Sequence, residues 1–204
     1  VSAWCDENEM VLGQVATDEK SNEIKAIPRL LKLIDITGAV VTTDAMGCQK
    51  EIAAAIIDEG GDYILQLKGN QAGLHEETVE LFDKCLTDDC RGIEYTTAKT
   101  LNKGHGRIEQ RTIWATEDVG WFAERKEWKK LRSLIRVQCQ RTVAGETSSE
   151  YHYYISSLPT DCPAKLLEKI RSHWGVENKL HWQLDISFGD DDRRARAGYG
   201  AENA

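Results

Sequence analysis

The sequence predicts an α/β layer fold in which strands and helices alternate at first and strands then follow one another. Short β-branched segments alternate with longer segments of helical period up to about residue 90. Between residues 92 and 157, four strand-like segments come without long helices between them. Alternating strands and helices are typical of a partly parallel sheet covered by helices. We therefore expect one sheet-based domain, with parallel strands in its first part.

The first part is expected to begin with a hairpin and to continue as alternating helices and strands. Residues 1–6 and 10–16 carry apolar side chains around the polar stretch 7–9, a pattern typical of a β-hairpin. Ser21 is the expected N-cap of a helix, and the apolar side of that helix carries Ile24, Ile27, Leu30, Leu31 and Ile34. After it we expect a buried strand at 39–44, a helix from Cys48 to Gly60, a strand at 62–68 and a helix at 74–86.

The second part is expected to be rich in strands until its final helix. Strands are predicted at 92–99, 106–116, 132–143 and 150–157, with a short helical piece near 121–130. Pro159 and Pro163 then precede a helix that starts near Ala164. The chain contains no internal repeat and no low-complexity segment.

Composition excludes several classes of protein. The longest apolar run, residues 53–57, is far too short to span a bilayer. The six cysteines are scattered and include no CxxC pair, which indicates reduced thiols in a cytoplasmic protein. The formal net charge of -8 argues against a nucleic-acid partner, but residues 99–141 hold eleven Lys or Arg against five Asp or Glu. That local excess of +6 fits a phosphate-facing surface and an ordinary solvated face equally well.

A ladder of potential metal ligands stands near the end of the chain. His173, Glu177, His181 and Asp185 recur every fourth residue, as they would on one face of a helix. Twelve residues of helix rise about 18 Å, and each step of four turns the face by about 40°. No single ion can reach all four side chains, so a metal site here needs a ligand from elsewhere. The alternative is a solvated polar face.

Asp44 is the candidate for that distant ligand. It ends the strand predicted at 39–44, and ligands of open α/β sheets gather at the carboxyl ends of strands. Carboxylate oxygens are the ligands that Mg²⁺ prefers, and Glu177 would supply a second carboxylate. The alternative role for Asp44 is to cap the following helix.

Four stretches in the same order across nearly the whole chain carry a family resemblance: TDAMGCQKEIA, YILQLKGNQ, GHGRIEQR and HWGVENKLHWQLDISFGDD. They resemble DDE-type transposases of the ISAs insertion-sequence family, which include H-repeat-associated proteins. The resemblance implies a ribonuclease-H-like mixed sheet with flanking helices, interrupted by a β-rich insertion. It divides the chain into a first core part at 1–87, the insertion at 88–158 and a last core part at 159–204.

The same resemblance assigns the active site. Asp44 is expected to be the second catalytic Asp and Glu177 the catalytic Glu, both as ligands of Mg²⁺ or Mn²⁺. The family's first Asp lies in a DGK-type motif upstream of the hairpin, so we expect an N-terminally truncated chain that is inactive alone. The signature of related transposases on the last helix is not kept, because Ile170, His173 and Leu184 stand at its Tyr, Arg and Lys positions.

The expected partner is DNA, both the transposon ends and the target, bound by a homodimer or higher oligomer without any membrane. Lys68, Asn70 and Gln71 follow a predicted strand and resemble a family motif near the active site, although a polar turn explains them equally. Aromatic Trp174 and Trp182 could stack on a base, but burial in the core is the stronger alternative. The expected DNA contacts are Lys68, Asn70, Gln71, His105, Arg107, Arg111, His173, Trp174, Asn178, Lys179 and His181.

Two other functions remain open on sequence grounds. A catalytically inactive DNA-binding remnant would keep the basic segment without the complete set of carboxylates. A metal-dependent hydrolase would use His173, Glu177 and His181 around zinc or iron. Preference for Mg²⁺ or Mn²⁺ over zinc would separate the transposase from the hydrolase.

Overall fold

The computed structural model describes residues 1–17, 23–87, 92–104 and 106–173. Its strands are β1 (Ser2–Cys5), β2 (Met10–Gln14), β3 (Val40–Thr43), β4 (Asp62–Leu67), β5 (Thr96–Gly104), β6 (Arg107–Thr116), β7 (Ser133–Val143) and β8 (Glu146–Ser156). Its α-helices are α1 (Glu23–Leu31), α2 (Lys50–Asp58), α3 (Ala72–Thr87) and α4 (Pro163–His173). Two short 3₁₀ helices are η2 (Gly69–Gln71) and η3 (Ala123–Glu127).

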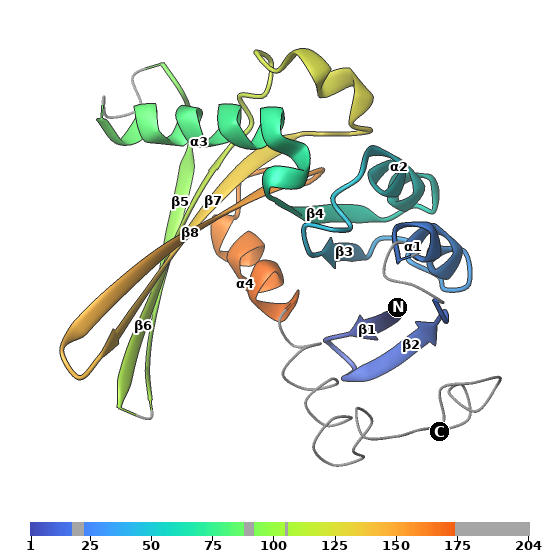
Figure 1. Cartoon of the computed structure of the whole chain (residues 1–204), viewed down its shortest axis with the longest axis horizontal. Helices are drawn as coiled ribbons and strands as arrows, with labels where there is room; N and C mark the ends of the chain where they lie inside the picture. The colour runs from blue at the N-terminus through green and yellow to red at the C-terminus, as the bar shows by residue number, and fades with distance from the viewer. Residues whose placement is uncertain (18–22, 88–91, 105, 174–204) are drawn as a thin grey trace.

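Six of these strands form one mixed sheet in the order β3-β4-β8-β7-β6-β5. The pair β3 and β4 is parallel and is connected through α2, whereas every other neighbouring pair is antiparallel. The antiparallel strands extend well past the helices as a long twisted ribbon (Figure 1). The predicted α/β class, a mixed sheet with flanking helices, is confirmed and is consistent with a DDE nuclease-like fold.

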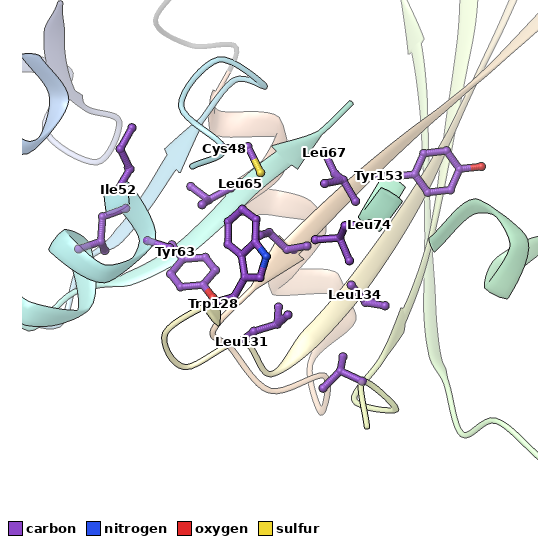
Figure 2. Close-up of a cluster of buried hydrophobic side chains, with 14 of the residues drawn as sticks. Cys48, Ile52, Tyr63, Leu65, Leu67, Leu74, Trp128, Leu131, Leu134 and Tyr153 are labelled. Carbon is purple, nitrogen blue, oxygen red and sulfur yellow. The ribbon is translucent and has the colours of Figure 1, made fainter. Parts of the chain in front are cut away.

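Helices cover both faces of the sheet because side chains alternate between the faces along each strand. Tyr63, Leu65 and Leu67 of β4 enter a cluster that is closed by residues of α2, α3 and the η3 region. Figure 2 shows Trp128 among the other side chains of this cluster. Ile64 points to the opposite face, where Leu166, Leu167 and Ile170 of α4 pack. Each face of the sheet therefore has its own buried cluster, with α4 covering the second.

The hairpin of β1 and β2 forms a separate two-stranded sheet, as the sequence predicts. It packs against α1 through a small cluster in which Val15, Ala26 and Leu30 are buried. Ser21, the expected N-cap of α1, lies outside the described residues. The helix ends at Leu31, so Ile34 lies beyond it rather than on its apolar side.

Four expected elements differ in detail from the structure. The strand expected at 92–99 is β5, which runs from Thr96 to Gly104. The strand at β3 is half-buried rather than buried, because it forms an edge of the sheet and has β4 as its neighbour. The helical piece expected at 121–130 is the single 3₁₀ segment η3. Strand β8 starts at Glu146, earlier than expected, because Ala144 and Gly145 adopt positive φ angles of 51° and 88°. Such a two-residue turn matches the twist of a hairpin and lets pairing continue up to it.

The strand-rich segment predicted at 88–158 continues the same sheet. Strand β8 pairs with β4 on one side and with β7 on the other, so residues before and after position 88 share one set of backbone hydrogen bonds. The division of the chain into core and insertion stays a prediction. Within the described part of the chain, no helix is long and apolar enough to cross a membrane.

Candidate active site

Asp44 lies directly after β3, exposed to solvent, at the carboxyl end of the parallel strand pair. Its Oδ1 accepts a hydrogen bond of 3.2 Å from the backbone N–H of Gly47. The N-cap of the following helix is Gln49, so Asp44 does not cap α2. Among the described residues, no Lys or Arg forms an ion pair with Asp44. An exposed carboxylate held at one oxygen is suited to bind a cation with the other.

Gly47 closes the turn that begins at Asp44. A Cβ at this position would lie 2.7 Å from both Cβ and Oγ1 of Thr43, closer than real side chains approach. The turn can therefore pack against β3 because the residue is glycine. The next residue, Cys48, is completely buried in the sheet cluster, and burial raises the pKa of its thiol to about 12.

Two predicted DNA contacts, Asn70 and Gln71, donate to the backbone of this loop. The Asn70 side-chain amide lies 2.6 Å from the carbonyl oxygen of Ala45, and the Gln71 amide lies 3.1 Å from that of Cys48. Both residues belong to η2, which follows β4, the parallel neighbour of β3. Contact of these two residues with DNA stays a prediction.

The end of α4 reaches the same edge of the sheet. The hydroxyl of Thr42 and Nδ1 of His173 lie 3.1 Å apart, within hydrogen-bonding distance. Thr42 is two residues before Asp44, and His173 is the last residue of α4. The helix starts near Thr160, beside β5, and ends at β3. It therefore runs across the sheet toward the edge that carries Asp44.

Arg107 and Arg111, both predicted to bind DNA, share one carboxylate on β6. Arg107 Nε lies 2.9 Å from Glu109 Oε1, and Arg111 Nη2 lies 3.0 Å from Glu109 Oε2. Partial burial acts to raise the pKa of Glu109, but the hydrogen bond from Arg111 and the charges of both arginines outweigh it and lower that pKa. Half of the positive charge of the two arginines is thus compensated within the strand.

The remaining charge of the basic segment is spread over several places rather than gathered on one surface. Lys129, Lys130 and Arg132 pair with Asp58, Asp62 and Glu117. Arg136 is buried beneath α3, where it pairs with Asp83 at 3.2 Å and lies over three aromatic rings. Arg136 is therefore a structural residue of the sheet face, which the sequence did not indicate.

Lys68 is exposed at the end of β4. It lies close enough to β8 for its charge to change the pKa of His152. Burial lowers the pKa of His152, the charge of Glu150 opposes this, and the charge of Lys68 lowers it further. Lys68 therefore places a positive charge at the edge of the sheet where Asn70 and Gln71 lie.

Several predicted site residues lie outside the described residues. They are His105, Trp174, Glu177, Asn178, Lys179 and His181. In the ranges that the structure does describe, no group of three or more His, Cys, Asp or Glu side chains could hold a metal ion. Of the two carboxylates predicted to bind Mg²⁺ or Mn²⁺, Asp44 is thus the one whose surroundings the structure gives. Sequence reasoning missed Thr42 and Gly47, and a glycine three residues after the Asp was the available signal for the second.

Comparisons with known proteins identify the family of this chain. The family described as "Transposase DDE domain" matches residues 1–204. "H repeat-associated putative transposase YhhI" of Escherichia coli (strain K12) is 40% identical over 207 residues, covering 99% of this chain and 54% of the relative. "Putative protein YbfL" of the same strain shows the same identity and coverage. "Putative transposase YncI" of Escherichia coli O157:H7 is 41% identical over 206 residues, covering 99% of this chain and 52% of the relative.

The chain spans about half the length of the curated relatives that it matches. The family match extends over every element of the described sheet and over both stretches that contain Asp44 and Glu177. Proteins of this family generally use divalent metal ions. The chain therefore belongs to the family of DDE transposase domains.

Proposed function

We propose that this chain supplies the catalytic core of a transposase, which cuts DNA strands at the ends of an insertion sequence and transfers them to target DNA. One observation carries the proposal: the Thr42–His173 contact brings the end of α4 beside the strand that presents Asp44. The family match supports the reaction class. Asp44 acts as one carboxylate of the site, and Glu177, four residues beyond His173, acts as another.

The Thr42–His173 contact supports the approach of Glu177 to Asp44. Val40 packs in the cluster on the α4 side of the sheet, and Thr42 contacts His173 on that side, so the strand that leads to Asp44 directs alternate side chains toward α4. Glu177 follows His173 by four residues, and Asp44 follows Thr42 by two. Both carboxylates therefore stand within a few residues of the same contact.

The residues fit a divalent ion of the Mg²⁺ or Mn²⁺ type. Asp44 offers an exposed hard oxygen donor, and Glu177 would add a second. When bound, such ions activate the attacking hydroxyl group and stabilise the leaving oxygen of the phosphodiester. Gly47 keeps the Asp44 carboxylate in place through its N–H. Thr42 and His173 hold the helix end against β3.

DNA is proposed to lie across the same side of the sheet. Alternation places Arg107 and Arg111 on the face of β6 that also carries Ile113, which packs beneath α4. The further proposed contacts are Lys68, His105, His173, Trp174, Asn178, Lys179 and His181. The working protein is proposed to be a dimer or higher oligomer on paired ends. No observation on the described residues favours the hydrolase, since Glu177 and His181, its other two proposed ligands, lie outside them.

The test is strand cleavage by the whole protein that contains this chain. Its substrate is a duplex bearing the DNA end of the element that encodes the protein, with Mg²⁺ or Mn²⁺ present. Cleavage is expected for the wild type and should fall by at least about a thousandfold in Asp44→Asn and in Glu177→Gln, because each removes a metal ligand.

Asp58→Asn is the matched control for this assay. Asp58 ends α2, the helix that begins near Asp44, so it lies at the far end of that helix, and its exposed carboxylate pairs with Lys129. This variant should cut as the wild type does. Equal cleavage by wild type and Asp44→Asn would overturn the assignment of the site.

A further inference from the structure

The loop of residues 44–49 connects β3 to α2. Two side-chain amides from the end of the neighbouring strand donate hydrogen bonds to it. Strands β3 and β4 are parallel neighbours, so the loop after β3 and the 3₁₀ helix after β4 meet at one edge of the sheet. Asn70 donates to the carbonyl oxygen of Ala45 at 2.6 Å, and Gln71 donates to that of Cys48 at 3.1 Å. The two bonds hold the loop at both of its ends.

The amide hydrogens of both residues are directed at this loop. A side-chain amide nitrogen carries two hydrogens. Asn70 Nδ2 has a second acceptor in the Cys48 carbonyl at 3.5 Å, and Gln71 Nε2 has one in Gln49 Oε1 at 3.4 Å. The three acceptors of these four hydrogen bonds all belong to the loop, so the amide hydrogens point away from any phosphate in the solvent. The remaining side-chain oxygens can accept hydrogen bonds but cannot donate them to a phosphate.

Asp44 depends on this loop for its orientation. The carboxylate is exposed, and its contact with the Gly47 N–H comes from within the same loop. Three restraints fix that loop: Gly47 packs against Thr43, Cys48 is buried in the core, and the carbonyl oxygens of Ala45 and Cys48 receive the two amides. Removal of the amides would leave the loop free to shift, and the carboxylate would shift with it.

We infer that Asn70 and Gln71 are positioning residues, which set the Asp44 carboxylate for metal binding by holding the carbonyl oxygens of its loop. This inference deepens the proposed function and rests on it. It assigns to the two residues a role different from DNA contact. A misplacement of about 1 Å in a catalytic group can cost about a hundredfold in rate, so such a role has a measurable effect.

The first test does not require activity. In the whole protein, Asn70→Leu and Gln71→Met remove the amides with little change in size, and the iodoacetamide alkylation rate of Cys48 is followed by mass spectrometry of its peptide. Cys48 is completely buried, so its alkylation reports loop opening. The rate should rise about tenfold in each variant, as expected for one lost hydrogen bond.

Gln110→Met is the matched control. Gln110 also donates its amide, to Gln140 Oε1 at 2.7 Å, but it lies on β6 away from the loop. This variant should leave the alkylation rate of Cys48 unchanged. Alkylation that is equally slow in all four proteins would overturn the inference.

The second test separates positioning from DNA contact. Cleavage of end DNA should slow at least about tenfold in Asn70→Leu and Gln71→Met, whereas the Kd for the same DNA, measured in Ca²⁺, should stay within about twofold. Melting temperatures should match that of Gln110→Met. A raised Kd with a shallower salt dependence would instead identify phosphate contacts and overturn the inference.

The outcomes distinguish this inference from the proposed function. If wild type and Asp44→Asn cut alike, the proposed function fails, and the positioning role fails with it, while the Cys48 alkylation rates still show whether the amides hold the loop. If Asp44→Asn is inactive but Asn70→Leu and Gln71→Met cut at the wild-type rate, the positioning role alone is rejected.

Discussion

Gly47 fixes the position of the Asp44 side chain and leaves no room for a side chain of its own. It supplies the N–H that binds the carboxylate, and its backbone approaches β3 so closely that no side chain fits against Thr43. The sequence identified Asp44 because a carboxylate at a strand end is a recognisable pattern. It could not identify Thr42 or the role of Asn70, because hydrogen bonds between segments distant in the chain leave no periodic signal.

Gly47→Ala is expected to destabilise the protein by about 1–3 kcal/mol, because the new methyl group would overlap the Thr43 side chain. Urea unfolding measures the change. Gly73→Ala is the control, since a Cβ there meets nothing within 4 Å and the residue lies in α3, where Ala is favoured. Its stability should equal or slightly exceed that of the wild type. An equal effect of both substitutions would show that the approach to Thr43 is not restrictive.

In the proposed DNA-binding role, Glu109 limits how much positive charge β6 can offer. Glu109→Gln is expected to raise DNA affinity and to steepen its dependence on salt, because Arg107 and Arg111 would lose their shared partner. Fluorescence anisotropy at several salt concentrations measures both quantities. Glu80→Gln changes the net charge equally but lies on α3, so it should have a much smaller effect. Equal gains in both variants would mean that net charge alone matters.

At the scale of elements, the order of strands and helices was the part of the fold that the sequence predicted best. The order of strands and helices from β1 to α4 agrees with the hydrophobic patterns, because each element buries one face. The pattern failed at β3, which looks fully buried in sequence but is an edge strand. Strand order depends on pairing between distant segments of the chain. A β-branched run has the same sequence pattern at the edge of a sheet as at its centre, so the pattern does not distinguish the two positions.

Glu117 links Arg132, just before β7, to Thr160, just before α4. It thereby helps to fix the start of α4. The hydrogen bond from Arg132 Nε at 2.8 Å, together with one from the Thr160 N–H at 2.9 Å, lowers the pKa of Glu117 despite partial burial. Because the folded-state pKa is depressed, the stabilisation is present above the ordinary value of 4.5 and is lost as pH falls through the lower folded value.

Glu117→Gln should therefore lower the melting temperature near neutral pH and have progressively less effect in acid. Melting temperatures of wild type and variant, measured from about pH 6 to about pH 3, should converge at the acid end. Curves that stay parallel over this range would contradict a role for the ionised carboxylate.

At the scale of the molecule, one continuous sheet joins segments that the sequence divides into core and insertion. Strand β8 lies between β4 and β7, and α4 crosses from β5 to β3 on one face. This topology brings the stretch of chain that leads to Glu177 beside the strand that presents Asp44, although the two residues are far apart in sequence. The position of Asp44 at a strand end and the family resemblance both predict that the two carboxylates converge, and this convergence stays a prediction.

The most direct measurement of the central claim is the distance between the Asp44 and Glu177 carboxylates in a crystal structure of the whole protein grown with Mn²⁺. The account predicts that both carboxylates bind the same pair of ions, which lie about 3.5 to 4 Å apart and are located by anomalous scattering. A structure in which the two carboxylates lie more than about 10 Å apart, or in which Mn²⁺ binds neither, would contradict it.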